Sequence, residues 1–498
     1  MIRTSSLTSK QQVHPWLRPV HVAVVASHTS PLLDNALSRL LDAFRAGGHL
    51  VQEAPDETTD LLIASAPFGR PLPWREAVLF TARRRFGLNR VPTVLTLVHA
   101  LPDEFHRLLD QLRRILRRSS PDPTDFAFEG LSPSAFEVLV EQGKRGGPIL
   151  ALERIVQAQA KSIRVLLFVG EDHPEEAYLF DLVGAYPRLL PSEGEAFYHD
   201  LVLRIATVLS TRQITEHEVV GEPIPAEEWR SLETPLHMIE AAREFGLRRF
   251  FDPAVKIADL VAVPSIGEVI AEQYSEGCFA TWEPRLPGLI STVTGSARPV
   301  DKDNITADDL AVIVGIRDDG RGALVRCVEE HRNDPPSSEA VEMFLLDRSL
   351  PTVSISMNGR HYKAPVVRSK LHGHRGVAAY HPDFVEFVPL DEPYYFYPVS
   401  CATEAQAYGI YHAFSRAECL RHPEDPRQAA FTILPGHGVM IVEKWAPGKR
   451  PFQVLWEYMD AGYLEIEPRV PQGALTFVAG ADGRRHLHDL MPVPYAEL

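Results

Sequence analysis

The chain is too long for a single domain, and its composition is that of a folded globular protein. It has 498 residues, of which 45% are hydrophobic and 23% charged, so extensive disorder is excluded. The 51 basic and 66 acidic residues give a net charge of −15, which argues against nucleic acid and anionic membranes as partners.

The cysteines and the start of the chain predict a cytoplasmic protein. Four cysteines occur without any CxxC pair, which fits a reducing compartment. The first 19 residues are polar and contain no apolar signal-peptide segment. No uncharged apolar run reaches the roughly 18 residues that would span a bilayer.

The first half of the chain alternates apolar runs with amphipathic stretches. Strands are predicted at 21–26, 61–65, 93–98 and 163–170, and helices at 31–46, 74–86, 102–117 and 194–210. This alternation is typical of parallel strands joined by helices, so we expect residues 1–220 to form a Rossmann-like, doubly wound α/β domain. The turn after the first strand contains no glycine and no Walker motif occurs, so no nucleotide site is predicted.

The middle of the chain predicts a change of domain. Residues 118–132 are rich in Ser, Pro and Asp and indicate a long surface loop. Prolines at 223, 225 and 235, with short helical patterns around them, indicate a connector over residues 221–262. After it, strands become shorter and histidine and tyrosine become frequent, which predicts a second domain over residues 263–498.

Three histidines of the second domain have the pattern of a metal site. His372 and His374 flank Gly373 in an extended segment, where residues i and i+2 project to the same face. His437 lies between two glycines, which allow close backbone approach, at the start of the apolar run 439–442. Three neutral imidazoles with one open position suit a catalytic Zn²⁺ or a similar cation. Because the chain has 20 histidines, a chance His-x-His pair is the alternative interpretation.

A candidate acid precedes these histidines. Ser337, Ser338 and Glu339 follow two prolines and lead into the apolar helical run 341–346. The two serines could present hydroxyls and amides to an anion at the helix start, while Glu339 faces the metal. The alternative is that Ser338 caps the helix and Glu339 is a first-turn acid stabilised by the helix dipole.

Five features in order resemble the class II aldolase/adducin family between residue 268 and about residue 473. They are a helical pattern at 269–277, a strand at 289–295 that ends in Thr294 and Gly295, an acidic helix-turn-strand step at 305–314, the Pro-Ser-Ser-Glu helix start, and the His-x-His strand followed by the His437 strand and a helix near 452–463. The resemblance implies an α/β/α sandwich built on a largely antiparallel sheet. It also implies a homo-oligomer, for example a tetramer, and a divalent cation, with Zn²⁺ first and Mn²⁺ or Fe²⁺ as alternatives.

The resemblance implies a reaction as well. The cation would chelate the carbonyl and hydroxyl oxygens of a sugar-like substrate and stabilise an enediolate, with Glu339 moving a proton beside it. Thr294, Gly295 and the two serines would bind the substrate. Family members take a proton-donating tyrosine from a neighbouring subunit, for which Tyr394 in the aromatic run 394–397 is the candidate. A packed strand or a subunit interface is the alternative role of that run.

The chain departs from the family where a substrate phosphate is usually held. The family's Gly-Asn-x-Ser turn is replaced at 280–285 by Ala-Thr-Trp-Glu-Pro-Arg, which weakens the expectation of a phosphorylated substrate. Arg285 could replace the lost donors as a substrate-binding residue. An ion pair with Glu283 is the more common fate of such an arginine.

These features predict a metal-dependent lyase that cleaves or dehydrates a sugar-like hydroxy-carbonyl compound. A glutamate rather than an aspartate at position 339 favours this over epimerisation, by analogy with how the family divides. A non-catalytic, adducin-like scaffold is an alternative, against which the three histidines and the glutamate argue. A third possibility places the main activity in the N-terminal domain, with the second domain as support.

Overall fold

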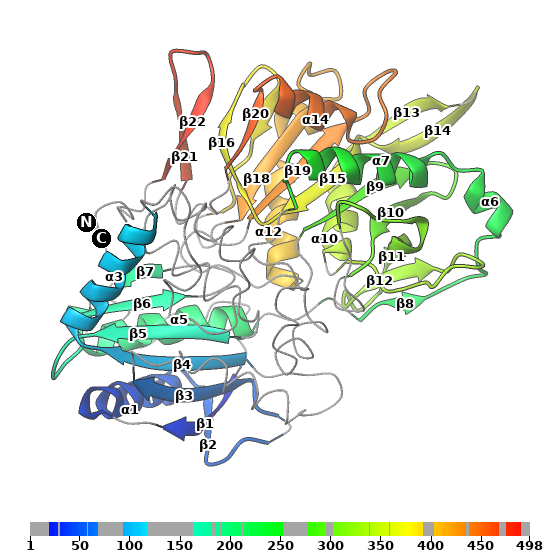
Figure 1. The fold of residues 1–498 in the computed structure, drawn as a ribbon. Coiled ribbons are helices and arrows are strands. Elements are labelled where there is room, and N and C mark those ends of the chain that lie inside the picture. Colours follow the sequence, from blue (N-terminus) through cyan, green and yellow to red (C-terminus); the bar gives the residue numbers. More distant parts are fainter. Residues whose placement is uncertain are drawn as a thin grey trace.

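The computed structural model shows a chain of mixed α/β class with several sheets (Figure 1). The structure describes residues 19–27, 30–56, 58–67, 93–116, 163–180, 186–189, 191–210, 214, 216–251, 277–294, 302–337, 339–357, 359–391, 403–434, 438–467 and 475–489. The apolar cores of these ranges divide into one built from residues before 211 and two built from residues after 213. The chain therefore contains at least two units with separate cores.

A seven-stranded sheet forms the first unit. Its order is β2 (Leu50–Gln52), β1 (His21–Ser27), β3 (Leu61–Pro67), β4 (Thr93–Ala100), β5 (Ile163–Val169), β6 (Glu176–Phe180) and β7 (Tyr186–Leu189). The first five strands pair in parallel and the last two extend the sheet antiparallel. The four strands predicted in this half are confirmed, whereas the antiparallel extension was not predicted.

Helices α1 (Pro31–Ala46), α3 (Pro102–Leu116) and α5 (Glu195–Ser210) accompany this sheet, with a short 3-10 turn η2 (Pro191–Glu193) before α5. The sequence starts α1 sharply, because the Ser30 hydroxyl accepts a hydrogen bond from Leu33 N at 3.2 Å and Pro31 lies in the first turn. Three predicted helices are thus confirmed to within about one residue. The helix predicted at 74–86 and the loop predicted at 118–132 lie outside the described residues.

A nine-stranded sheet forms the centre of the second unit. Its order is β17 (Val385–Phe387), β18 (Ala429–Leu434), β19 (Gly438–Lys444), β15 (Val367–Gly373), β9 (Cys278–Glu283), β10 (Gly288–Thr292), β11 (Leu310–Ile316), β12 (Ala323–Arg326) and β8 (Glu218–Val219). Only the two edge pairs, β17 with β18 and β12 with β8, are parallel. The expectation of a largely antiparallel sheet is therefore confirmed.

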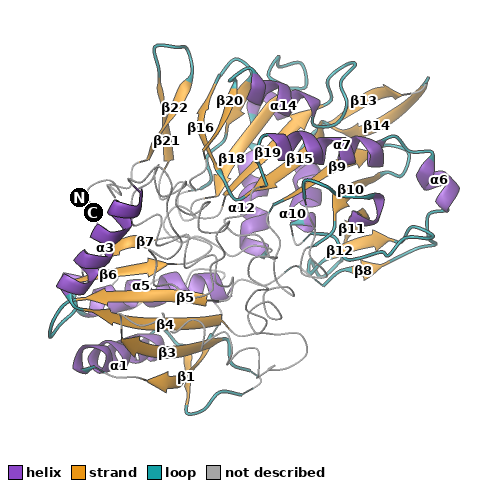
Figure 2. Cartoon of the chain, in the orientation of Figure 1, coloured by secondary structure: helices purple, strands orange, loops and turns teal. Residues whose placement is uncertain are grey.

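Helices pack against both faces of this sheet (Figure 2). Helices α10 (Ala340–Leu345) and α12 (Glu404–Ser415) share one core with Cys278 and Ala280 of β9. Helices α7 (Thr234–Leu247) and α14 (Gln453–Asp460) share the other with Phe279, the residue between them. Strand residues thus alternate between two helical layers, as the two-residue repeat of a strand requires.

Shorter elements complete the second unit. They are α6 (Ala226–Arg230), α13 (Glu418–Arg421), the 3-10 turns η3 (Ala307–Asp309) and η4 (Leu346–Ser349), a hairpin of β13 (Thr352–Met357) and β14 (Arg360–Pro365), and a four-stranded sheet in the order β20 (Leu464–Glu467), β16 (Gly376–Tyr380), β22 (Arg485–Asp489) and β21 (Leu475–Ala479). Within the ranges given above, no helix combines the length and apolarity needed to cross a bilayer.

Within the segment expected to connect the domains, residues 221–251 contribute to the second unit instead. Met238 and Phe245 of α7 are buried in its core, and β8 pairs with β12 at the sheet edge. Two of the three prolines interpreted as linker residues stand at helix starts, since Pro225 precedes α6 and Pro235 lies in the first turn of α7. Proline suits a first turn because its missing N–H has no partner there anyway.

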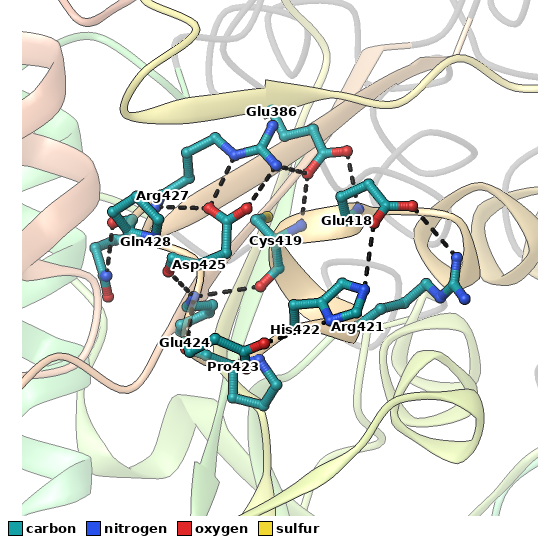
Figure 3. A network of polar contacts seen from close by, with 12 residues as sticks. Glu386, Glu418, Cys419, Arg421, His422, Pro423, Glu424, Asp425, Arg427 and Gln428 are labelled. Atoms are coloured by element: carbon teal, nitrogen blue, oxygen red, sulfur yellow. Dashed lines mark hydrogen bonds and ion pairs between the residues drawn. The ribbon is translucent and has the colours of Figure 1, made fainter.

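A polar network fixes the loop that leads into β18 (Figure 3). The Lys444 ammonium donates to the carbonyl oxygens of Cys419, Pro423 and Asp425 at 3.2, 3.1 and 2.6 Å. Hydrogen bonding from Arg427 holds the pKa of the Asp425 carboxyl below its usual range. The network ties the loop to β19 and has a structural role.

Candidate metal centre

The first two candidate ligands lie at the end of β15, in the middle of the nine-stranded sheet. In the register of this strand, His372 is opposite Cys278 on β9 and Met440 on β19. Residues directly opposite one another in antiparallel strands project to the same face. Cys278 and Met440 both belong to the core beneath α10 and α12, so the imidazole of His372 lies on that face too.

The two imidazoles lie next to each other, as the His-x-His spacing predicts. The ring centroids of His372 and His374 are 5.4 Å apart, with an angle of 68° between the ring planes. Nδ1 of His372 lies 3.0 Å from the carbonyl oxygen of Val439. Because a carbonyl only accepts, Nδ1 carries the proton, and in the neutral ring Nε2 then carries the lone pair. This is the tautomer of a histidine that binds a metal through Nε2.

Glycines let β15 and β19 approach closely beside these rings. A Cβ atom on Gly438 would lie 2.1 Å from the carbonyl oxygen of Gly373 and 3.0 Å from Cα of His374. A Cβ atom on Gly373 would lie 2.4 Å from the ring of Phe250. The residue that follows His437 is thus packed against the residues that carry the histidine pair.

Glu339 precedes α10 and faces the same side of the sheet. It is only 4% exposed, and its Oε2 accepts hydrogen bonds from the Ser337 hydroxyl at 2.6 Å and from the Cys278 thiol at 3.4 Å. Although Glu339 occupies the N-cap position, its side chain makes no capping hydrogen bond. The carboxylate is therefore directed toward the sheet rather than toward the first turn of its own helix.

Cys278 links the acid to the histidine pair, a role that could not be predicted from the sequence pattern. Its thiol contacts Glu339, and its backbone pairs with His372 across the two strands. Burial and the neighbouring Glu339 raise the pKa of the Cys278 thiol well above its usual value, so the thiol stays protonated and can donate. A cross-strand partner depends on register, which the spacing of the cysteines does not reveal.

The segment before α10 runs along the end of β10 and brings two predicted substrate-binding residues together. Thr294 N donates to the carbonyl oxygen of Pro335 at 2.9 Å, and Ser337 N donates to that of Thr292 at 2.8 Å. Ser337 is fully buried. Thr294 and Ser337 therefore belong to the same neighbourhood as Glu339.

A buried lysine adds a positive charge to this neighbourhood. Lys302 is 6% exposed and its ammonium donates to the carbonyl oxygen of Val293 at 2.9 Å. Its charge acts on Cys278, where it opposes the increase of the thiol pKa. Sequence reasoning missed Lys302, because a single lysine between strands is usually solvated.

Arg285 lies elsewhere. It is exposed in the turn between β9 and β10, beyond the end of β9 that is opposite to Cys278. Its guanidinium donates to the carbonyl and hydroxyl oxygens of Ser231 at 2.8 and 2.7 Å. Glu283 accepts the backbone N–H of Arg285 at 2.8 Å. The structure therefore does not bring this side chain to the candidate metal centre.

Four of the predicted site residues, Gly295, Ser338, Tyr394 and His437, lie outside the described residues. Among the residues that are described, no group of three or more His, Cys, Asp and Glu side chains is placed to hold an ion. The adjacent imidazoles of His372 and His374 fit two positions of a ligand set for a first-row cation. The third imidazole would have to come from His437.

No protein-family model, no curated protein and no solved structure matches this chain. The resemblance to the class II aldolase/adducin family therefore depends on the sequence motifs alone.

Proposed function

We propose that the second unit is a class II aldolase-like, metal-dependent lyase that cleaves or dehydrates a sugar-like hydroxy-carbonyl compound. One observation carries the proposal: the imidazole of His372, which lies next to that of His374, shares a face of the central sheet with Cys278, and the Cys278 thiol contacts the buried Glu339 carboxylate. The proposal includes an α/β/α sandwich of that family over residues 263–498 and a Rossmann-like, doubly wound domain over residues 1–220. Residence in the cytoplasm is part of it, on the grounds of cysteine usage.

His372, His374 and His437 would hold the cation, which is Zn²⁺ in the first instance, with Mn²⁺ or Fe²⁺ as alternatives. When bound, such a cation acts as a Lewis acid toward the carbonyl and hydroxyl oxygens of the substrate. His372 is prepared for this role by the carbonyl of Val439, which orients its ring and fixes its tautomer.

Glu339 would move the proton at the carbon next to the substrate carbonyl. The Ser337 hydroxyl and the Cys278 thiol both donate to Oε2 and help to fix the orientation of the carboxylate. A fixed acid/base at hydrogen-bonding distance from the reacting atom typically contributes about 10²–10⁴-fold to the rate. Thr294 and Ser337 would line the substrate side, with Gly295 and Ser338 next to them in the sequence.

A proton donor from a second copy of the chain completes the proposal. Tyr394 of a neighbouring subunit, in a homo-oligomer such as a tetramer, would donate a proton to the departing aldehyde. Closed rings place the same surface of each copy beside its neighbour, so each copy can complete the site of another.

To test the proposal, metal-loaded protein is incubated with a library of ketoses, aldoses and hydroxy acids, and the products are identified by mass spectrometry. Cleavage gives two smaller carbonyl compounds, dehydration gives loss of one water, and epimerisation leaves the mass unchanged. We expect Glu339→Gln to lower the rate by about 10²–10⁴-fold. Glu283→Gln is the matched control, because it alters another buried glutamate, at the end of β9 that lies away from Cys278.

Two results would contradict the proposal. One is that no compound is converted, as the adducin-like scaffold requires. The other is that Glu339→Gln turns over as fast as the Glu283→Gln control. Conversion that survives loss of Glu339 would place the activity elsewhere, for example in the first unit.

A further inference from the structure

A buried ion pair joins the strand that carries the histidine pair to the helix that carries the acid. The Lys370 ammonium lies 2.6 Å from Oδ2 of Asp347, and the two side chains are 0% and 8% exposed. Lys370 belongs to β15, and Asp347 belongs to η4, which continues α10 directly. We infer that Lys370 and Asp347 are positioning residues, which set Glu339 relative to His372 and His374. The inference rests on the proposed function.

Both residues are close to the candidate site along the chain. Lys370 precedes His372 by two residues, about 6.6 Å along a strand, and both side chains lie on the same face. Their partners on β9, Ala280 and Cys278, lie in the same core as α10. A shift of β15 at Lys370 would therefore move the histidine pair by a similar amount.

Asp347 connects the helix that Glu339 precedes to β15. It follows Glu339 by eight residues, about 12 Å of helix. Within α10, both carboxylate oxygens of Glu342 accept hydrogen bonds from Nε2 of Gln406 on α12, at 2.8 and 2.9 Å. The short helix is thus fastened to α12 through Glu342 and to β15 through Asp347, and these two contacts fix its rotation and its height above the sheet.

The energetics favour a positioning role over a stabilising one. Removing two charges from water costs several kcal/mol per ion, and apolar replacements of similar volume are often neutral or stabilising. A hydrophobic pair at this place would pack as well but would tolerate sliding, because dispersion contacts have no preferred direction. An ion pair allows only a narrow range of distances between the two groups. What it adds is a defined distance between β15 and α10.

The experiment replaces the ion pair by apolar side chains in the full-length protein, as Lys370→Met with Asp347→Leu. Zn²⁺ affinity is measured by competition, and the visible spectrum is recorded for the Co²⁺-loaded protein. Loss of residues that orient metal ligands typically weakens metal binding by about 10–100-fold. We expect a loss in this range and a changed Co²⁺ spectrum, with an unchanged or raised melting temperature.

Lys444→Met is the matched control, because it removes another buried lysine from the neighbouring strand without contact to α10. It should lower stability yet leave the Co²⁺ spectrum as in the wild type. If the double variant does not fold, Asp347→Glu decides the matter: it keeps the charges but lengthens the link by one methylene, and a changed Co²⁺ spectrum is expected.

The outcomes separate this inference from the proposed function. Wild-type protein that binds neither Zn²⁺ nor Co²⁺ contradicts the proposed function, and the positioning role falls with it. Wild-type protein that binds both ions, together with folded variants whose affinity and spectrum match it, contradicts the positioning role alone.

Discussion

The stability of the second unit should depend on pH through one buried glutamate, Glu443. It is 1% exposed on β19, and its Oε1 accepts hydrogen bonds from the Ser369 hydroxyl at 2.7 Å and from the backbone N–H of Phe452 at the start of α14. Burial raises the pKa of Glu443 from 4.5 to about 7, although these hydrogen bonds and the charge of Arg368 act in the opposite direction.

The expected magnitude follows from these values. At 1.36 kcal/mol per pH unit, the interval from 4.5 to about 7 corresponds to roughly 3 kcal/mol. The folded protein holds this proton more tightly than the unfolded chain does. The stabilisation from the protonated carboxyl is therefore complete below pH 4.5 and is lost as the pH rises through about 7.

The test compares the wild type with Glu443→Gln, which keeps an oxygen acceptor for Ser369 and Phe452 but cannot ionise. Urea unfolding followed by tryptophan fluorescence gives the free energy of unfolding at pH 5 and pH 8. From pH 5 to pH 8, the free energy of unfolding of the wild type should fall by up to about 3 kcal/mol more than that of the variant. Glu404→Gln, at the start of α12, controls for loss of a glutamate charge. An equal change of the unfolding free energy with pH in Glu443→Gln and the wild type would refute a raised pKa of Glu443.

Three further substitutions test the fold and the approach of the strands. Phe245→Ala should cost about 3–5 kcal/mol of unfolding free energy and exposed Leu247→Ala less than about 0.5, since α7 is core rather than connector; equal effects would contradict this. Gly438→Ala should reduce metal affinity and melting temperature together, because its Cβ would meet the Gly373 carbonyl oxygen; a variant identical to the wild type in both would argue against the close approach. Ser30→Ala should cost about 1 kcal/mol through loss of the α1 cap, measured by chemical denaturation, and no change would mean that the cap is unimportant.

The elements of the first unit could be predicted because their patterns are local. Strands such as β4 and β5 are rich in β-branched and other apolar residues, and α1 has an apolar face with a serine cap and a proline at its start. The strands β6 and β7 were missed because they are short and their pairing depends on contacts made after the chain turns back. Sequence patterns report periodicity, whereas sheet extension depends on tertiary contacts.

In the candidate site, too, local features could be predicted and long-range contacts could not. The proximity of His372 and His374 could be predicted, because a two-residue spacing in a strand fixes a shared face. The contact of Cys278 with Glu339 could not, because it joins residues that are 61 positions apart. Arg285 was placed near a ligand by analogy with a family turn, but the geometry of the β9–β10 turn directs its guanidinium to Ser231.

Metal analysis of the purified protein tests the central claim most directly. We expect about one equivalent of Zn²⁺, Mn²⁺ or Fe²⁺ per chain, which is lost in His372→Ala and in His437→Ala. His412→Ala, at an exposed histidine of α12, should retain it. A wild type without metal, or a metal content that is the same in all three variants, would contradict the account.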